Sequence, residues 1–207
     1  MTLVLNKDQK EIIPFELLEG EKRLDVVLAG EGAEVEIVGL VIGKGSDERS
    51  LETYITHAAP NTKSKVNVRA VLRGKAKFDF RGNVKIEKGA KGADAYLRSD
   101  ALLFDDAKMG DDTPALEILE PDVKAGHAAT IGKVDEQMLF YLMTRGLSRT
   151  QAEKLLVEGF IEPIKNILRA SYTSREVDGN SRLGSNNKSR PARHRKHELA
   201  QALRAGR

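Results

Sequence analysis

The sequence predicts a mainly β protein that ends in a pair of helices and a basic tail. From Arg23 onward, short segments of alternating apolar and polar residues follow one another, separated by turns rich in glycine and charge. In one segment Val66, Val68 and Ala70 fall on the same side of an extended chain. Past Gly132 the apolar period changes from 2 to about 3.6 residues. Short strands with no long helix between them indicate a sandwich, a barrel or a solenoid, and periodicity does not choose among the three.

Composition agrees with a core made of thin layers. Of the 207 residues 40% are apolar, but only 5% are aromatic and tryptophan is absent. The core must therefore be built mainly from Val, Leu, Ile and Ala. Such a core suits the narrow layers of a solenoid better than the bulkier interior of an α/β enzyme.

The sequence carries no targeting or membrane signal. It contains no run of about 18 apolar residues. Its first residues lack the charged and then apolar order of a signal peptide. We therefore expect a cytoplasmic protein that does not enter a membrane. Cysteine is absent, so the chain brings no thiolate ligand.

Changes in pattern divide the chain into four segments. They are an N-terminal strand or loop at 1–22, the β domain at 23–134, a helical domain at 135–172 and a tail at 173–207. The stretch from Lys165 to Arg207 holds 11 Lys and Arg against 3 Asp and Glu, whereas the net charge of the whole chain is +3. A polar, Arg-rich tail buries too little to offset its ordering entropy, so we expect it to be disordered.

The first helix is expected to begin after Asp135, whose carboxylate is a typical N-cap. Gly146 is expected to end it. Its apolar stripe comprises Met138, Leu139, Leu142 and Met143.

A second helix is expected to open at Ser148, after a link so short that the two helices must form a hairpin. Its apolar side comprises Ala152, Leu155, Leu156 and Phe160. Pro163 is expected to stop this helix or to divide it into a further segment.

Three motifs resemble the SufB/SufD family of SUF iron-sulfur cluster assembly proteins. The first is His57-Ala-Ala-Pro-Asn-Thr followed by a strand and Phe80-Arg-Gly. The second is Thr113-Pro-Ala-Leu-Glu-Ile with Asp122-Val-Lys-Ala-Gly-His after it. The third is Leu139-Phe-Tyr-Leu-Met-Thr-Arg-Gly-Leu-Ser. The resemblance selects one of the three β architectures: it implies a right-handed parallel β-helix followed by the helical hairpin.

The resemblance also implies a function. Family members are subunits of a machine that builds iron-sulfur clusters, driven by an ABC ATPase. We expect a subunit that is not an enzyme, pairing with a SufB-like scaffold or with itself and binding a SufC-like ATPase. Iron-sulfur clusters are normally held by thiolates, so the chain should hold no cofactor alone. A transient cluster or iron could form only at the interface with a SufB-like partner. Since typical members are longer and carry an N-terminal helical domain before the β-helix, we expect a short member without that domain.

His127 is the candidate ligand at that interface. In SufD-type members a histidine in this segment takes part in building the nascent cluster, and imidazole is a competent iron ligand. The cysteine and the acidic residue of SufB-type members correspond here to Ser99 and Ala128, so the chain is closer to SufD. The alternative is a structural histidine beside Gly126 at a turn. His57, before a turn, is interpreted as structural.

The resemblance places the ATPase interface on the helical hairpin, where aromatic and arginine anchors are expected. The candidates are Phe140, Tyr141, Arg145 and Phe160. Alternatively, some of them cover the open end of the solenoid, which must be protected against edge association.

Two other functions compete with cluster assembly. The chain could be a β-solenoid interaction module without cluster chemistry. RNA could bind the tail, where Arg190–Lys196 would contact phosphates. The tail lacks aromatic residues on which bases could stack, so nucleic acid contact there would be non-specific.

Overall fold

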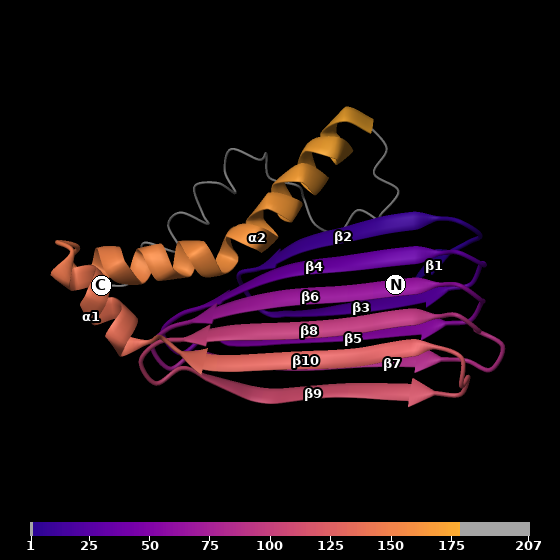
Figure 1. Ribbon diagram of the computed structural model, residues 1–207, viewed down its shortest axis with the longest axis horizontal. Coiled ribbons are helices and arrows are strands. Elements are labelled where there is room, and N and C mark those ends of the chain that lie inside the picture. Colours follow the sequence, from indigo (N-terminus) through magenta and orange to yellow (C-terminus); the bar gives the residue numbers. More distant parts are fainter. Residues whose placement is uncertain (1, 179–207) are drawn as a thin grey trace.

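The chain winds ten strands into a two-sheet parallel solenoid and then adds two helices (Figure 1). The computed structural model describes residues 2–178, with side chains to Ser171. The strands are β1 (Thr2–Leu5), β2 (Lys10–Leu17), β3 (Glu21–Leu28), β4 (Glu34–Gly43), β5 (Glu48–His57), β6 (Lys63–Leu72), β7 (Lys77–Ile86), β8 (Asp94–Leu103), β9 (Lys108–Ile118) and β10 (Lys124–Lys133). The helices are α1 (Glu136–Thr144) and α2 (Arg149–Asp178).

Successive strands alternate between the two sheets. One sheet has the order β1-β3-β5-β7-β9 and the other β10-β8-β6-β4-β2, and each strand pairs in parallel with the strand two ahead of it. The predicted parallel solenoid is thereby confirmed, because a sandwich of hairpins would pair neighbouring strands antiparallel. The segment 1–22 contains β1 and β2, which extend both sheets.

The core lies between the two sheets and is filled by every second side chain. Val66, Val68 and Ala70 are buried there, as the alternation predicted. Phe78 and Phe80 stack with ring centroids 6.3 Å apart. Nearly all the other buried side chains are Val, Ile, Leu or Ala, because two sheets this close leave no room for larger layers.

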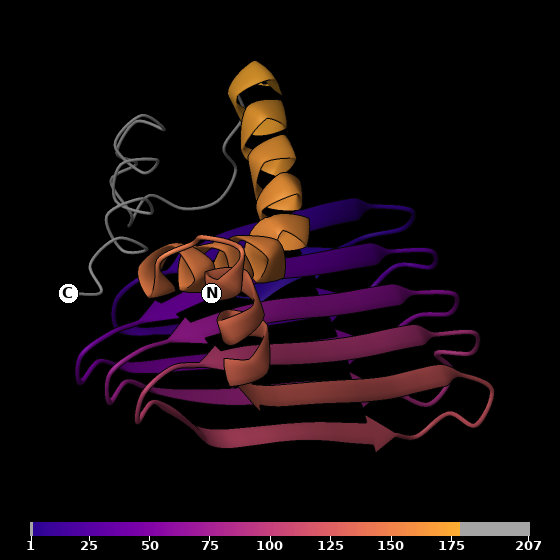
Figure 2. The ribbon, with the colours of Figure 1, turned by 60° about the vertical axis from the view of Figure 1, so that its left-hand side comes forward.

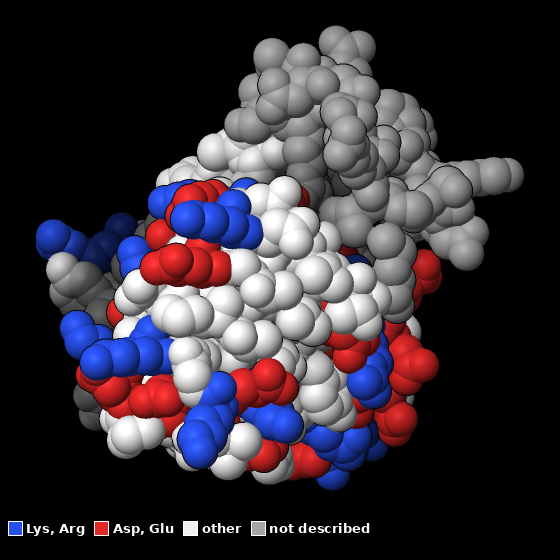
Figure 3. Space-filling model, turned by 90° about the vertical axis from the view of Figure 1, so that its right-hand side faces the viewer, with Lys and Arg blue, Asp and Glu red and all other residues white. Residues whose placement is uncertain are grey.

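Stacked turns hold one end of the solenoid together. Asp8, Gly32, Asn61 and Gly92 take up the left-handed backbone conformation, and each N–H donates to a carbonyl of the following turn. Gly92 has a φ of 72°, and a Cβ there would also lie 2.5 Å from the Asn61 Oδ1, so this position favours glycine. Figure 3 views this end of the molecule: few charges occupy its centre, and both signs mix around its rim.

His57 joins the end of β5 to the start of β6. It is fully buried, and its Nδ1 and Nε2 each lie 2.8 Å from a hydroxyl, of Thr62 and Ser64 respectively. The Thr62 hydroxyl donates to the Ala59 carbonyl. Nδ1 must therefore donate to Thr62, which leaves Nε2 to accept from Ser64. The ring is neutral and structural, as the sequence suggested.

Helix α1 begins and ends, and α2 begins, where their sequence signals predicted. The Asp135 carboxylate accepts from the Gln137 and Met138 N–H groups, and Gly146 follows α1 with a φ of 93°. At the start of α2, Ser148 and Gln151 form a reciprocal capping box.

The buried face of α2 differs from the predicted one. The helix packs on the outer face of the even-numbered sheet (Figures 1 and 2), where Val157, Ile161, Ile164 and Leu168 are buried. The prediction included Leu155, which is 49% exposed. The helix buries the side that contacts the apolar outer residues of β4 and β6. The sequence of the helix alone does not show where these strand residues lie.

Pro163 does not stop α2, which continues to Asp178 with a change of direction along its length (Figure 1). The proline lacks the N–H that would pair with the Gly159 carbonyl. Next to it, the Arg69 guanidinium donates to the Phe160 carbonyl. Packing of the helix on the sheet outweighs the lost hydrogen bond. The rest of the predicted tail, 179–207, lies outside the described residues.

We predict that His57 makes stability depend on pH. Burial lowers its pKa from 6.5 to about 4. Between these two pH values the histidine is protonated in the unfolded chain and neutral in the folded chain. The free energy of unfolding should therefore fall as the pH drops from about 6.5 to 4, by on the order of 3 kcal/mol. Urea unfolding of the wild type and of His57→Gln measures the difference. The variant should be less stable at pH 7, and its stability should depend less on pH in this interval. Parallel pH profiles would contradict the assignment.

Candidate functional site

The last turn of the solenoid is open. β9 and β10 are the final strands of their sheets, so one backbone edge of each has no neighbouring strand among residues 2–178. We call the inward-facing side chains of these two strands the mouth. Met109, Leu116 and Ala125 in the mouth are half-buried against the core, and Ile118 and Ile131 are 45% and 51% exposed. Exposed apolar side chains beside two unpaired strand edges are typical of a surface that binds another polypeptide.

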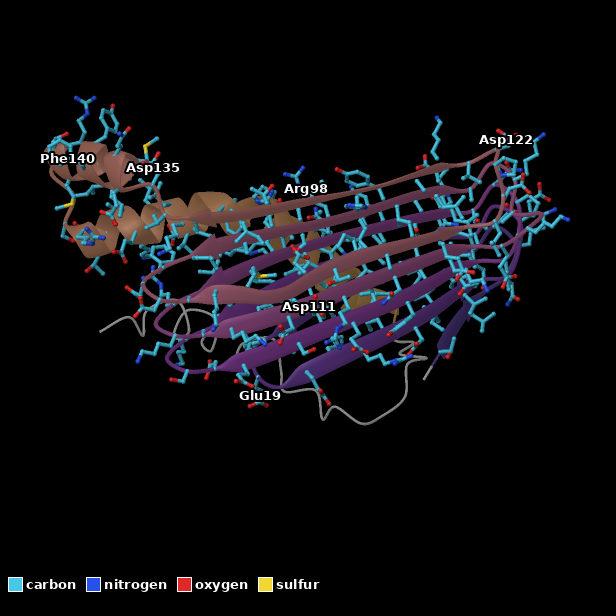
Figure 4. The ribbon with its side chains drawn as sticks, turned by 90° about the horizontal axis from the view of Figure 1, so that it is seen from below. Glu19, Arg98, Asp111, Asp122, Asp135 and Phe140 are labelled. Atoms are coloured by element: carbon cyan, nitrogen blue, oxygen red, sulfur yellow. The ribbon has the colours of Figure 1, made fainter. Side chains whose placement is uncertain are left out.

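His127 lies in this mouth. It pairs in register with Leu97 of β8, a core residue, so it faces the interior, and its side chain is exposed at the open end. Ser99 pairs with Ala129 and is buried one turn below the mouth. Ala128 pairs with Arg98, which projects outward from the sheet in Figure 4. The structure therefore brings His127 and Ser99 to the same side of the sheet and Ala128 to the other.

Asp112 is a mouth residue that the sequence did not reveal. It pairs with the buried Phe80, so it faces inward from β9, on the sheet opposite His127. The sequence offers only two neighbouring aspartates, Asp111 and Asp112, within a strand. Alternation places one of them inward, but it does not show which one.

The described residues include no complete metal centre. No three His, Asp or Glu side chains among residues 2–178 converge in a way that could hold an ion. The 207-residue sequence has no cysteine. The mouth can therefore supply at most part of a coordination shell.

A second surface lies on α1, at the far end of β10. Only Leu139 of this helix is buried. Met138, Phe140, Tyr141 and Met143 are 45%, 69%, 54% and 41% exposed, so the predicted apolar stripe faces mostly solvent. Figure 4 shows Phe140 and Asp135 at this end and Asp122 at the other.

Three of the four predicted ATPase anchors share α1 and its C-cap, and the fourth does not. The Arg145 guanidinium lies 5.8 Å from the centre of the Tyr141 ring. Tyr141 also lines a hollow of about 370 Å³ together with Met138. Phe160 is instead half-buried on α2, beneath the Arg69 guanidinium, which lies 5.1 Å from its ring centre. Tyr141 and Arg145 are thus in contact, and Phe140 is a further exposed side chain of the same helix.

Comparison with known proteins identifies the family. Residues 20–160 match the family described as SUF system FeS cluster assembly, SufBD core domain. The chain belongs to the SufBD family. No helix within residues 2–178 of this SufBD protein is long and apolar enough to cross a membrane.

The SufBD chain is similar to proteins of both named types. It is 37% identical to the iron-sulfur cluster assembly protein SufD of Bacillus subtilis over 141 residues, which are 68% of this chain and 32% of that protein. Identity to SufB of the same organism is 33% over 146 residues, or 70% of this chain and 31% of SufB. A SufBD family protein of Mycobacterium tuberculosis is 38% identical over 147 residues, 71% of this chain and 17% of that protein. The chain spans less than a third of these relatives.

Proposed function

We propose that the chain is a non-catalytic, SufD-like accessory subunit of SUF-type iron-sulfur cluster assembly. The observation that carries the proposal is the open mouth, which holds a histidine but no thiolate. Such a surface can contribute to a cluster shared with another subunit but cannot hold one alone, since cluster iron needs several ligands.

The mouth is the proposed pairing surface. Parallel strands with free edges gain hydrogen bonds from an added strand, and the exposed Ile118 and Ile131 lose contact with water at the same time. The partner would be a cysteine-bearing, SufB-like subunit or a second copy of this chain. A SufB-like partner supplies the thiolates that this chain lacks, whereas two copies of it would bring none.

The exposed surface of α1 is the proposed docking site for a SufC-like ABC ATPase. Aromatic and arginine side chains are frequent anchors in protein interfaces. Phe140, Tyr141 and Arg145 are such side chains, and the hollow beside Tyr141 could receive a side chain of the partner. Phe160, half-buried on the sheet, would contribute by holding α2 in place.

His127→Ala should impair cluster formation without preventing subunit assembly, because the side chain faces the shared mouth and its exposure limits its role in folding. The measurement is anaerobic reconstitution of the complex with a SufB-like partner, followed by iron and sulfide analysis. Thr130→Ala, on the outward side of the same strand, is the matched control and should load normally. Wild-type loading of the His127→Ala complex would reduce His127 to a structural residue. A full cluster on the isolated wild-type chain would contradict the accessory-subunit function, because the chain would then hold a cluster without a partner.

Phe140→Ala and Tyr141→Ala should each weaken ATPase binding by more than about 1 kcal/mol, since both rings are exposed and available to an interface. The melting temperature should stay nearly unchanged for the same reason. Calorimetric titration with a SufC-like ATPase measures the effect. Val4→Ala, which removes a 50% exposed side chain from β1, is the control and should bind normally. Equal affinities for all three variants would remove α1 from the interface and favour a solenoid module without an ATPase.

A further inference from the structure

Asp112 owes its position to an irregularity in β9. Met109 pairs with Phe78, and Asp112 pairs with Phe80. Between these two pairs β9 contains one more residue than β7, which is a β-bulge. Such a bulge changes which side chains point inward, and bulges are frequent beside functional sites. Here it turns Asp111 outward and Asp112 inward.

The two neighbouring aspartates differ in what the fold gives them. The Asp111 carboxylate lies 2.9 Å from Arg81 Nε and accepts from the Thr113 hydroxyl, and these contacts lower its pKa. Asp112 Oδ2 is buried without a hydrogen-bond partner among the residues that the structure describes. Burial, and then the Asp111 charge, raise the pKa of Asp112. Asp111 therefore stabilises the fold, whereas Asp112 costs stability.

His127 is the group on the opposite wall of the mouth that acts electrostatically on this carboxylate. It faces inward from β10, the opposite wall of the mouth, and its charge favours the ionised form of Asp112. No hydrogen bond joins the two side chains in the described structure. A carboxylate oxygen and an imidazole nitrogen directed into one opening are ligands that ferrous iron accepts together.

We propose that Asp112 and His127 form an open half-site for a divalent transition metal, ferrous iron above all, at the mouth of the solenoid. The proposal rests on the function proposed above and adds to it a second ligand and the form in which iron is received. The two side chains come from opposite sheets, so they would hold the ion between the two walls. Water, or a group from a subunit paired with the mouth, completes the coordination shell. Metal binding would then explain why the fold keeps Asp112, whose buried Oδ2, without a hydrogen-bond partner in the described part of the chain, lowers stability.

The test is an anaerobic titration of the full chain with Co²⁺, a spectroscopic substitute for Fe²⁺. His194 and His197 are replaced by alanine in every sample, because two histidines three residues apart can bind metal themselves. We expect Asp112→Asn and His127→Ala to weaken Co²⁺ binding about tenfold or more. Asp111→Asn is the matched control, with the same change of charge one residue away, and should keep the affinity within about twofold. Asp112→Glu retains a carboxylate and should keep most of the binding.

Thermal unfolding without metal supplies a second readout. Asp112→Asn should raise the melting temperature, because it removes an unpaired carboxylate, and Asp111→Asn should lower it, because it breaks the contact with Arg81. A gain in stability together with a loss of Co²⁺ affinity is the signature of a residue kept for binding.

Three results would overturn the half-site. They are wild-type Co²⁺ affinity in Asp112→Asn, an equal loss in Asp111→Asn, and no binding by the parent chain at millimolar Co²⁺. None of them contradicts the accessory-subunit function, which is measured separately by cluster loading of the complex with a SufB-like partner.

Discussion

Hydrogen bonding between successive turns is the constraint on which the whole molecule depends. In a parallel solenoid the backbone groups of each strand are satisfied by the strands before and after it, and the side chains of one turn pack on those of the next. The last turn has no successor, so β9 and β10 keep free edges and the core ends in half-covered side chains. An exposed edge is a liability unless something covers it. The mouth is one of the two ends at which the sheets of the described residues stop.

The helical surface is connected directly to the mouth. β10, which carries His127, leads into the Asp135 cap and α1 within three residues. α2 then returns across the even-numbered sheet, where Arg69 contacts both Phe160 and Asp100 of β8. The helices therefore connect to β10 directly through residues 134–135, and to its neighbour β8 through the contact between Arg69 and Asp100. This arrangement is what a subunit needs if an ATPase bound to α1 is to act on a shared site in the mouth.

The sequence predicted most of the architecture, because alternation and capping are local signals. The strand pattern, the Asp135 cap and the structural role of His57 all follow from residues close in sequence. The buried face of α2 did not follow, since it depends on apolar residues on β4 and β6 that belong to another part of the chain. Asp112 was missed for a related reason: one extra residue in β9 reverses which aspartate points inward, and only the pairing with β7 reveals it.

The central claim, that the mouth is the surface through which the subunit works, can be tested by amide hydrogen exchange. Free edges and a half-covered core should make the amides of β9 and β10 exchange faster than those of the central strands β5 and β6. Addition of a cysteine-bearing, SufB-like subunit should slow exchange in β9 and β10 and leave exchange in β1 and β3, at the other end of the odd-numbered sheet, unchanged. Protection confined to other strands, with β9 and β10 exchanging as in the free chain, would contradict the account.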